Sequence, residues 1–192
     1  MEAEKSKEVP PPEEMNAEET KDDEEDPTTF NRIEEILKEN DIDYDVATHK
    51  AAITAQESAD VRGATLESGA KSMLIVDRSK KLNSVYFLCV MSAAEKINWK
   101  LIKEIIGTKK LKLATVEEVL TQTGCAVGGV PPFGSLFNVH TYVDNSLVEQ
   151  GETISFNAGL KTRSILMKTE DYLKVENPNL CNFIVKEEPK SE

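Results

Sequence analysis

The residues between Gly124 and Gly134 combine small size with rigidity in a way that suits contact with a ligand. This eleven-residue stretch, GCAVGGVPPFG, contains four glycines and the adjacent prolines Pro131 and Pro132. Glycine adopts backbone conformations closed to other residues and lets another molecule approach closely, whereas proline fixes φ and lacks an N–H. We therefore expect a stiff loop whose N–H and C=O groups face a bound molecule, although a loop that only turns a corner has the same composition.

Two further positions carry groups that could do chemistry. Lys71 follows Gly69 and Ala70 and directly precedes the apolar run 72–76, so its ammonium would stand at the mouth of a strand. A cation there attracts phosphate or carboxylate, although a solvated flank is the alternative interpretation. The break Asn157-Ala158-Gly159 follows a strand-like segment and is either a turn or a place where a ligand approaches the backbone.

The histidines and cysteines give little sign of metal or nucleophilic chemistry. His49 and His140 each lie beside a β-like segment, where single histidines are usually structural. Cys89 lies in an apolar run, which predicts a buried thiol, and Cys125 would need a base brought to it by the fold. The three cysteines, with Cys181, lack metal-ligand or disulfide spacing, which argues against structural zinc and favours a reducing compartment, the cytoplasm.

The charge of the chain is concentrated at its start. Residues 1–29 hold three lysines against twelve acidic residues, which is −9 of the total of −12, and they include four prolines and no aromatic residue. Such a segment buries too little apolar surface to order itself, so we predict disordered tails over 1–29 and 186–192 around one domain, 30–185. No apolar run approaches the roughly 20 residues of a membrane span, and we expect no membrane association.

Hydrophobic spacing and capping residues predict the elements that must position these groups. Thr28 or Thr29 is expected to cap a first helix, a capping box of Thr54 and Glu57 begins a second, and the last begins at Thr169. Two more cover 98–106, closed by Gly107, and 115–123, opened by a capping box of Thr115 and Glu118 and closed by Gly124. The expected strands cover 44–48, a hairpin of 73–76 and 85–91, and then 139–143, 154–156 and 164–167. Because strands come in pairs and are not each followed by a helix, we predict an α+β fold with a mixed, mostly antiparallel sheet and flanking helices.

These segments together resemble the YbaK family, the aminoacyl-tRNA deacylases related to the editing insertion of bacterial prolyl-tRNA synthetase. The resemblance is carried by Gly69-Ala70-Lys71 opening a strand, the loop VGGVPPFG at 127–134, Tyr142-Val143-Asp144, and Asn157-Ala158-Gly159. His49 followed by Thr54 ahead of a short helix matches the start of that domain. The resemblance covers about residues 30–175, which is nearly all of the predicted domain.

The resemblance implies a hydrolase that cleaves the ester between a mischarged amino acid and the terminal ribose of a tRNA, without metal, cofactor or covalent intermediate. It places Lys71 in the active site and the GxxxP motif from Gly128 to Pro132 around the aminoacyl group. We expect Lys71 to pair with the 3′-end phosphate or to polarise the ester. Gly128, Gly129 and Val130 are expected to make backbone contacts that stabilise the oxyanion. The expected substrate-binding residues are His49, Thr54, Val130, Pro131, Pro132, Phe133, Asn157 and Gly159.

Specificity and partners stay open at this point. Alanine, cysteine, serine or threonine, including on tRNA-Pro, are all compatible with a small pocket, which discriminates only modestly. A non-catalytic module that binds a tRNA end or a synthetase complex is an alternative, as is a small-molecule hydrolase with the same pocket. The partner we expect is the CCA end of aminoacyl-tRNA, and the acidic tail is a candidate docking segment for a synthetase. Lysines 100, 103, 109, 110 and 112 form either a local basic patch or a solvated helix face.

Overall fold

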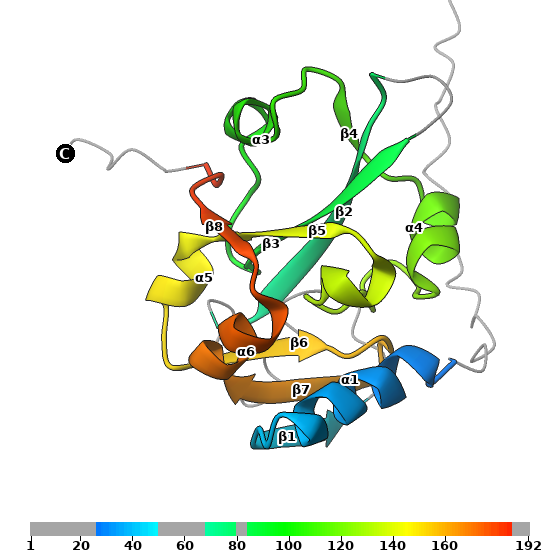
Figure 1. The fold of residues 1–192 in the computed structure, drawn as a ribbon, viewed down its shortest axis with the longest axis vertical. Helices are drawn as coiled ribbons and strands as arrows, with labels where there is room; N and C mark the ends of the chain where they lie inside the picture. The colour runs from blue at the N-terminus through cyan, green and yellow to red at the C-terminus, as the bar shows by residue number, and fades with distance from the viewer. Residues whose placement is uncertain (1–25, 50–67, 80–83, 186–192) are drawn as a thin grey trace, which may run out of the picture.

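The computed structural model describes residues 26–49, 68–79 and 84–185, and the chain folds there into helices around two β-sheets (Figure 1). The helices are α1 (Thr28–Glu39), α3 (Trp99–Ile106), α4 (Val116–Thr123), α5 (Asn145–Glu149) and α6 (Thr169–Glu176), with a 3-10 turn η1 (Gly134–Phe137). The strands are β1 (Tyr44–Thr48), β2 (Ala70–Asp77), β3 (Val85–Ser92), β4 (Leu111–Leu113), β5 (His140–Asp144), β6 (Thr153–Asn157), β7 (Arg163–Lys168) and β8 (Asn179–Cys181).

The strands form two sheets where the sequence predicted one. One sheet has the order β1-β7-β6 and is antiparallel throughout, and the other has the order β4-β2-β3-β5-β8. In the larger sheet β2 pairs antiparallel with β3 and β4, whereas β3–β5 and β5–β8 are parallel. The α+β class and the mostly antiparallel pairing are therefore confirmed, and the division into two sheets is the correction.

The two sheets meet where β2 begins. Gly69 forms a parallel bridge with Ser155 of β6, and the Ser155 N–H donates to the Ser68 carbonyl at 3.0 Å. Lys71 and Asn157 each lie two residues beyond this bridge, on strands that run in the same direction there. The start of β2 and the end of β6 therefore belong to one region of the molecule.

The five-stranded sheet is apolar on both faces, because successive strand residues point to opposite sides. Leu74 and Leu88 belong to a core cluster that also contains the apolar face of α1 and the inner residues of the smaller sheet. Ile75 and Cys89 belong to a second cluster, closed by Ile102 of α3. Cys89 is fully buried, as its sequence context predicts.

Helix boundaries follow the predicted caps with one exception. Asn98 caps α3, Thr115 and Glu118 form the capping box of α4, and both helices end at a glycine with positive φ. The exception is α1, which begins at Thr28, where neither Thr28 nor Thr29 is the cap. Instead the Asp26 carboxylate accepts from the Thr28 N–H at 2.9 Å. The predicted capping box of Thr54 and Glu57 lies outside the described residues.

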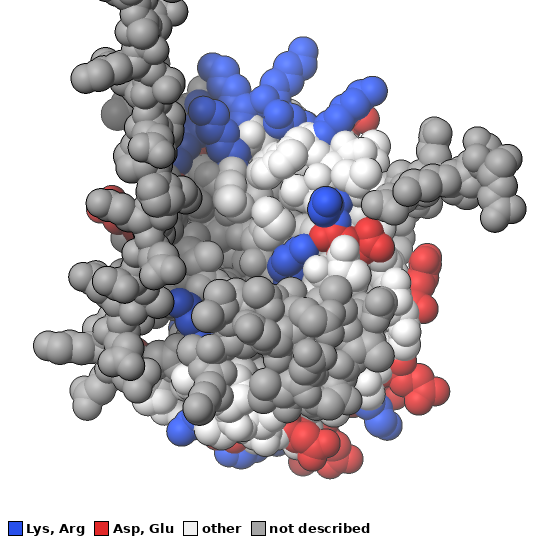
Figure 2. Space-filling view, turned by 180° about the vertical axis from the view of Figure 1, so that it is seen from behind, with Lys and Arg blue, Asp and Glu red and all other residues white. Residues whose placement is uncertain are grey.

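Charge is distributed unevenly over the surface. Figure 2 shows lysine and arginine side chains gathered at the end of the molecule where α3 and β4 lie, whereas most acidic side chains lie along one side and toward the other end, together with some basic ones. The N-terminal part contributes to this separation, since residues 34–45 of α1 and β1 hold six acidic residues and one lysine. Within the described ranges, no helix is both long and apolar enough to cross a bilayer.

Candidate functional site

The glycine-proline loop is a tight turn with a defined backbone path. The Gly129 N–H donates to the Ala126 carbonyl at 2.9 Å, which closes the turn, and Gly128 has a φ of +89° that favours glycine. Gly128 is exposed, whereas Gly129 and the residues that follow it are buried. The exposed corner of the loop is therefore the part that a ligand could reach.

The end of β6 holds this corner in place. The Asn157 side-chain amide donates to the Gly128 carbonyl at 2.7 Å, and the Gly159 N–H donates to the Gly129 carbonyl at 2.9 Å. A Cβ on Gly129 would lie 3.1 Å from the Gly159 carbonyl oxygen, so this close approach favours glycine. The fold thus brings together four of the residues that the sequence singled out, Gly128, Gly129, Asn157 and Gly159.

His49 is connected to the loop through a residue that sequence reasoning missed. Ser164 donates its hydroxyl hydrogen to Asn157 Oδ1 at 3.0 Å, and His49 Nε2 lies 2.7 Å from the same hydroxyl oxygen. Because a serine hydroxyl has one hydrogen to donate, His49 Nε2 carries the hydrogen in this contact. A serine at an inward position of the strand 164–167 was the available signal, since a buried hydroxyl needs a partner.

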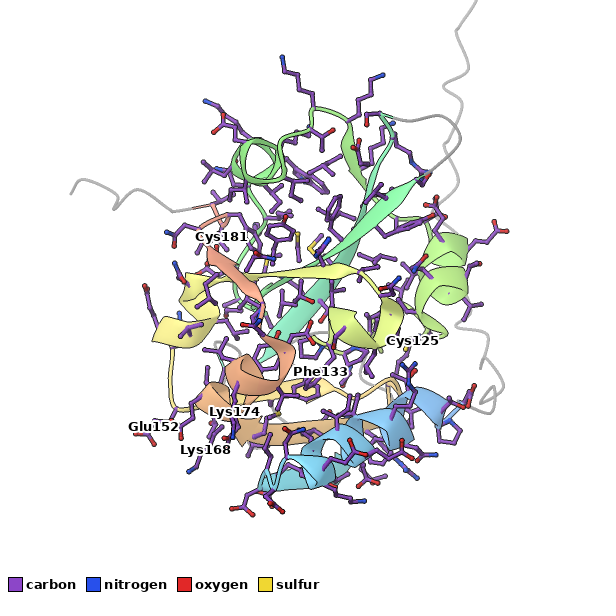
Figure 3. The ribbon with its side chains drawn as sticks, in the orientation of Figure 1. Cys125, Phe133, Glu152, Lys168, Lys174 and Cys181 are labelled. Atoms are coloured by element: carbon purple, nitrogen blue, oxygen red, sulfur yellow. The ribbon has the colours of Figure 1, made fainter. Side chains whose placement is uncertain are left out.

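The proline end of the loop is anchored in the core. The Phe133 ring is fully buried and packs edge-to-face on Phe156 and Tyr172, at centroid distances of 5.6 and 5.4 Å. The Tyr172 hydroxyl donates to the Pro132 carbonyl at 2.8 Å, and Pro131 and Pro132 are buried. Figure 3 shows Phe133 in the interior between the two sheets. We expected Phe133 to bind substrate, whereas its contacts are those of a core residue that holds the loop.

Of the three backbone N–H groups expected to face the substrate, two are available in the loop. The N–H and C=O of Gly129 are both engaged, with Ala126 and Gly159, so Gly129 serves the turn. Among the described residues no acceptor bonds the N–H of Gly128 or of Val130. Buried backbone N–H groups rarely lack a partner, and Val130 is 9% exposed. Within the GxxxP motif, whose two prolines have no N–H, these two groups are therefore the donors available to a ligand.

Lys71, at the start of β2, makes its own set of contacts away from the loop residues. Its ammonium donates to the carbonyls of Glu95 at 2.6 Å and Ala93 at 3.3 Å, which leaves one of its three hydrogens without a partner in the described part of the chain. The side chain lies on the same face of β2 as Met73 and Ile75, and no described hydrogen bond joins it to residues 128–132. Burial lowers the pKa of Lys71, and the Glu95 carboxylate opposes this effect.

Ser72, the next residue of β2, points to the opposite face and has a buried hydroxyl. In the described ranges this oxygen has no hydrogen-bond partner, a feature shared only with Ser146 of α5. An unpaired buried hydroxyl costs about 1–3 kcal/mol, so its retention suggests a ligand. The sequence offered no signal for Ser72, because the strand pattern predicts only that it lies inside an apolar run.

The remaining candidates of the sequence do not join the site as reactive groups. Cys125 is buried behind the loop, with its sulfur 3.6 Å from the Thr29 hydroxyl, and burial raises the pKa of its thiol, so it stays protonated. His140 is exposed on β5, and Thr54 lies outside the described residues. Within the described ranges no group of three His, Cys, Asp or Glu side chains could hold a metal ion.

Comparison with known proteins gives one family and one fold. Residues 49–175 match the model of the aminoacyl-tRNA editing domain. The chain is 31% identical over 155 residues to the multifunctional Ser/Thr-tRNA deacylase ProXp-y of Escherichia coli K12, which covers 81% of this chain and 92% of that protein. Two solved structures share the fold at 21% identity. The hypothetical protein APE2540 has a TM-score of 0.71, covering 80% of this chain and 99% of that one. A candidate trans-editing enzyme for prolyl-tRNA synthetase has a TM-score of 0.69, covering 82% of this chain and 98% of that one.

Proposed function

The chain belongs to the aminoacyl-tRNA editing domain family and is an aminoacyl-tRNA hydrolase, and we propose that it removes serine or threonine from mischarged tRNA as a free-standing enzyme. The family predicted from the sequence motifs is thereby confirmed. The choice of serine and threonine rests on the Escherichia coli relative, which is named for these substrates.

The observation that carries the proposed chemistry is the loop corner held by Asn157 and Gly159. We propose that the N–H groups of Gly128 and Val130 bind the carbonyl oxygen of the ester. Water adds to the carbonyl carbon, and the negative charge on the oxygen is stabilised by these fixed donors. The intermediate then collapses, the ribose oxygen leaves and takes up the proton that the attacking water gives up, and free amino acid and tRNA result. A free ribose hydroxyl of the substrate would assist the attacking water.

Lys71 has a binding role in this proposal. Its ammonium is half-buried and keeps one hydrogen for a ligand, and the start of β2 lies beside the end of β6. We propose that this hydrogen binds the phosphate of the terminal nucleotide and so orients the ester against the loop. Lysine suits this role because an ammonium is a compact point charge for phosphate.

The test is a deacylation assay on tRNAs charged with serine, threonine, alanine, cysteine or proline. We expect Ser-tRNA and Thr-tRNA to be cleaved fastest by the parent. Lys71→Met should lower kcat/KM by about a hundredfold, because an ester that is no longer held in position against the loop reacts more slowly by a factor of this order. Lys71→Arg, which keeps the positive charge, should retain most of the activity. A parent that leaves every ester intact, or a Lys71→Met protein as fast as the parent with unchanged Tm, would contradict the proposal.

We also propose that the acidic residues 1–25 dock the enzyme to a synthetase and that the enzyme acts in the cytoplasm. The segment has eleven acidic residues and three lysines, which suits a basic partner surface. A co-purification experiment would compare the parent with a chain that starts at Asp26. Loss of the synthetase together with unchanged turnover at saturating tRNA is the expected outcome, and retention of the synthetase by the shortened chain would refute docking through this segment.

A further inference from the structure

Five lysines form a cationic surface at the end of the molecule opposite α1. We call this surface the α3–β4 lysine cluster; its members are Lys100, Lys103, Lys109, Lys110 and Lys112. All but the half-buried Lys103 are exposed, and this is the end where Figure 2 shows basic side chains gathered. The cluster stands out because the chain carries a total charge of −12.

The charges of this cluster are not neutralised by neighbours. Between residues 99 and 113 the only acidic residue is Glu104, and among the described residues none of the five lysines forms an ion pair. Elsewhere in the described ranges three cations do form ion pairs, among them Arg78 with Glu118 at 2.7 Å. Long unpaired ammonium groups with the same sign repel one another, so a cluster of five favours an anionic partner.

The cluster and the candidate site lie at the two ends of one strand. Lys71 is the second residue of β2, and Asp77, its last residue, is paired with Leu111 of β4. The backbone connection continues beyond the strand, because the Arg78 N–H donates to the Lys110 carbonyl at 3.0 Å. Six residues of extended strand span about 20 Å, so the cluster stands one strand length from the ammonium of Lys71.

We propose that the α3–β4 lysine cluster binds the phosphate backbone of the acceptor-stem duplex of the tRNA whose 3′ end occupies the site. This inference rests on the proposed function, since it assigns the substrate a second contact beyond its reacting end. A single-stranded 3′ end would span the roughly 20 Å between Lys71 and the cluster, and the duplex would begin at the cluster. Double-stranded RNA is bound chiefly through phosphates and ribose hydroxyls, and lysines supply such sequence-independent contacts.

The experiment compares two double variants with the same charge change. K109Q/K110Q removes two members of the cluster, and K168Q/K174Q removes two exposed lysines that Figure 3 labels beside α6. Binding of uncharged tRNA is followed by fluorescence anisotropy between 50 and 300 mM salt. We expect K109Q/K110Q to bind about tenfold more weakly at low salt, with a log–log salt slope smaller by about 1.5, and the control to match the parent. Equal weakening in both variants, or none in K109Q/K110Q, overturns the proposal.

A second readout separates this inference from the proposed function. Deacylation is measured on a full-length charged tRNA and on an aminoacylated CCA trinucleotide, which lacks a duplex. K109Q/K110Q should raise KM for the tRNA and leave the trinucleotide reaction unchanged, because only the former reaches the cluster. If the parent cleaves neither ester, the proposed function is wrong, whereas the anisotropy measurement still tests whether the cluster binds tRNA. If the variant instead loses only an acidic protein partner and keeps tRNA affinity, the cluster is a protein-docking surface and the proposal is wrong.

Discussion

Ser72 and Ser146 offer a matched pair for separating stability from substrate binding at the level of single residues. Both hydroxyls are buried without a partner among the described residues, but Ser72 adjoins Lys71 whereas Ser146 lies in α5. Removing either hydroxyl relieves the cost of an unpaired buried group, about 1–3 kcal/mol. We expect Ser72→Ala and Ser146→Ala each to raise Tm by a few degrees.

The two variants should differ in deacylation activity. If the Ser72 hydroxyl is kept for the substrate, Ser72→Ala lowers kcat/KM, whereas Ser146→Ala retains the parent value. Tm from calorimetry and kcat/KM from the deacylation assay provide the two measurements. Equal activity in both variants, with both stabilised, would show that Ser72 is an unpaired core hydroxyl without a role in catalysis.

At the level of elements, the contact between α1 and the site depends on Gly159. A Cβ at this position would lie 2.7 Å from the Thr29 Cβ, and its φ of +87° disfavours other residues. Gly107, at the end of α3, has a similar φ of +79° but no described heavy atom within 4 Å of such a Cβ. Gly107→Ala therefore carries only the backbone cost, about 1–2 kcal/mol, whereas Gly159→Ala adds a collision with α1.

We accordingly expect Gly159→Ala to lower the free energy of unfolding, measured with urea, by more than Gly107→Ala does. It should also lower kcat, because the Gly159 N–H holds the Gly129 carbonyl. Gly107→Ala should leave kcat unchanged. Equal losses of stability in the two variants would mean that α1 moves aside without cost.

The end of α6 provides a pH-dependent connection to the loop. The buried Glu176 carboxylate accepts from the Ser135 N–H at 3.2 Å, the Ser135 hydroxyl at 2.6 Å and the Thr141 hydroxyl. Burial raises the pKa of Glu176 above its ordinary value of 4.5, and these hydrogen bonds oppose the shift. The folded state therefore holds a proton that the unfolded state has lost, and stability falls as the pH rises from about 4.5 through the raised pKa.

Glu176→Gln should remove this pH-dependent part of the free energy of unfolding. We expect the free energy of unfolding of the parent, minus that of Glu176→Gln, to decrease with rising pH over that window and to level off above it. Urea titrations at intervals from pH 4.5 to 8 give the difference curve. A difference that rises with pH would show that the hydrogen bonds outweigh burial and that the pKa is lowered.

Local signals in the sequence predicted the helices and most strands, because caps and apolar spacing act within a few residues. Thr115 and Glu118 form the predicted capping box, and Phe30, Ile33 and Leu37 are buried on one face of α1. The short strands β4 and β8 and the helix α5 were missed, since three to five residues carry too little pattern. The division into two sheets also escaped prediction, because pairing partners are far apart in the chain.

The candidate site was likewise predicted only as far as local sequence signals reach. The sequence identified the loop, Asn157, Gly159 and His49 as candidates. In the fold, Asn157 and Gly159 bond the loop directly, and Ser164 joins His49 to Asn157. The sequence could not tell that the Gly129 N–H is used by Ala126 or that Phe133 packs on Tyr172, since both facts depend on the tertiary path of the loop. The position of the Lys71 ammonium, on the carbonyls of residues 93 and 95, is of the same kind.

For the molecule as a whole, the separation of charge predicts an effect of the N-terminal segment on tRNA affinity. Deleting residues 1–25 changes the net charge from −12 to −4 and keeps Asp26, whose carboxylate accepts from Thr28. We expect the shortened chain to bind tRNA more tightly at 20 mM salt and equally at 1 M, where charges are screened within about 3 Å. Turnover at saturating tRNA should not change.

Fluorescence anisotropy with labelled tRNA measures this effect. A full-length chain whose acidic residues in 1–25 are replaced by Asn and Gln is the control, because it keeps the length and removes the charge. It should bind as tightly as the shortened chain. If this control binds tRNA only as tightly as the parent does, the effect of the deletion comes from the size of the segment and not from its charge.

The bridge between Gly69 and Ser155 has a consequence for the newly made protein. The loop is fastened to the end of β6 and Lys71 belongs to β2, so the apparatus is complete only after the two sheets have docked. The proposed mechanism therefore predicts that a nascent or partly unfolded copy lacks the means to discharge tRNA.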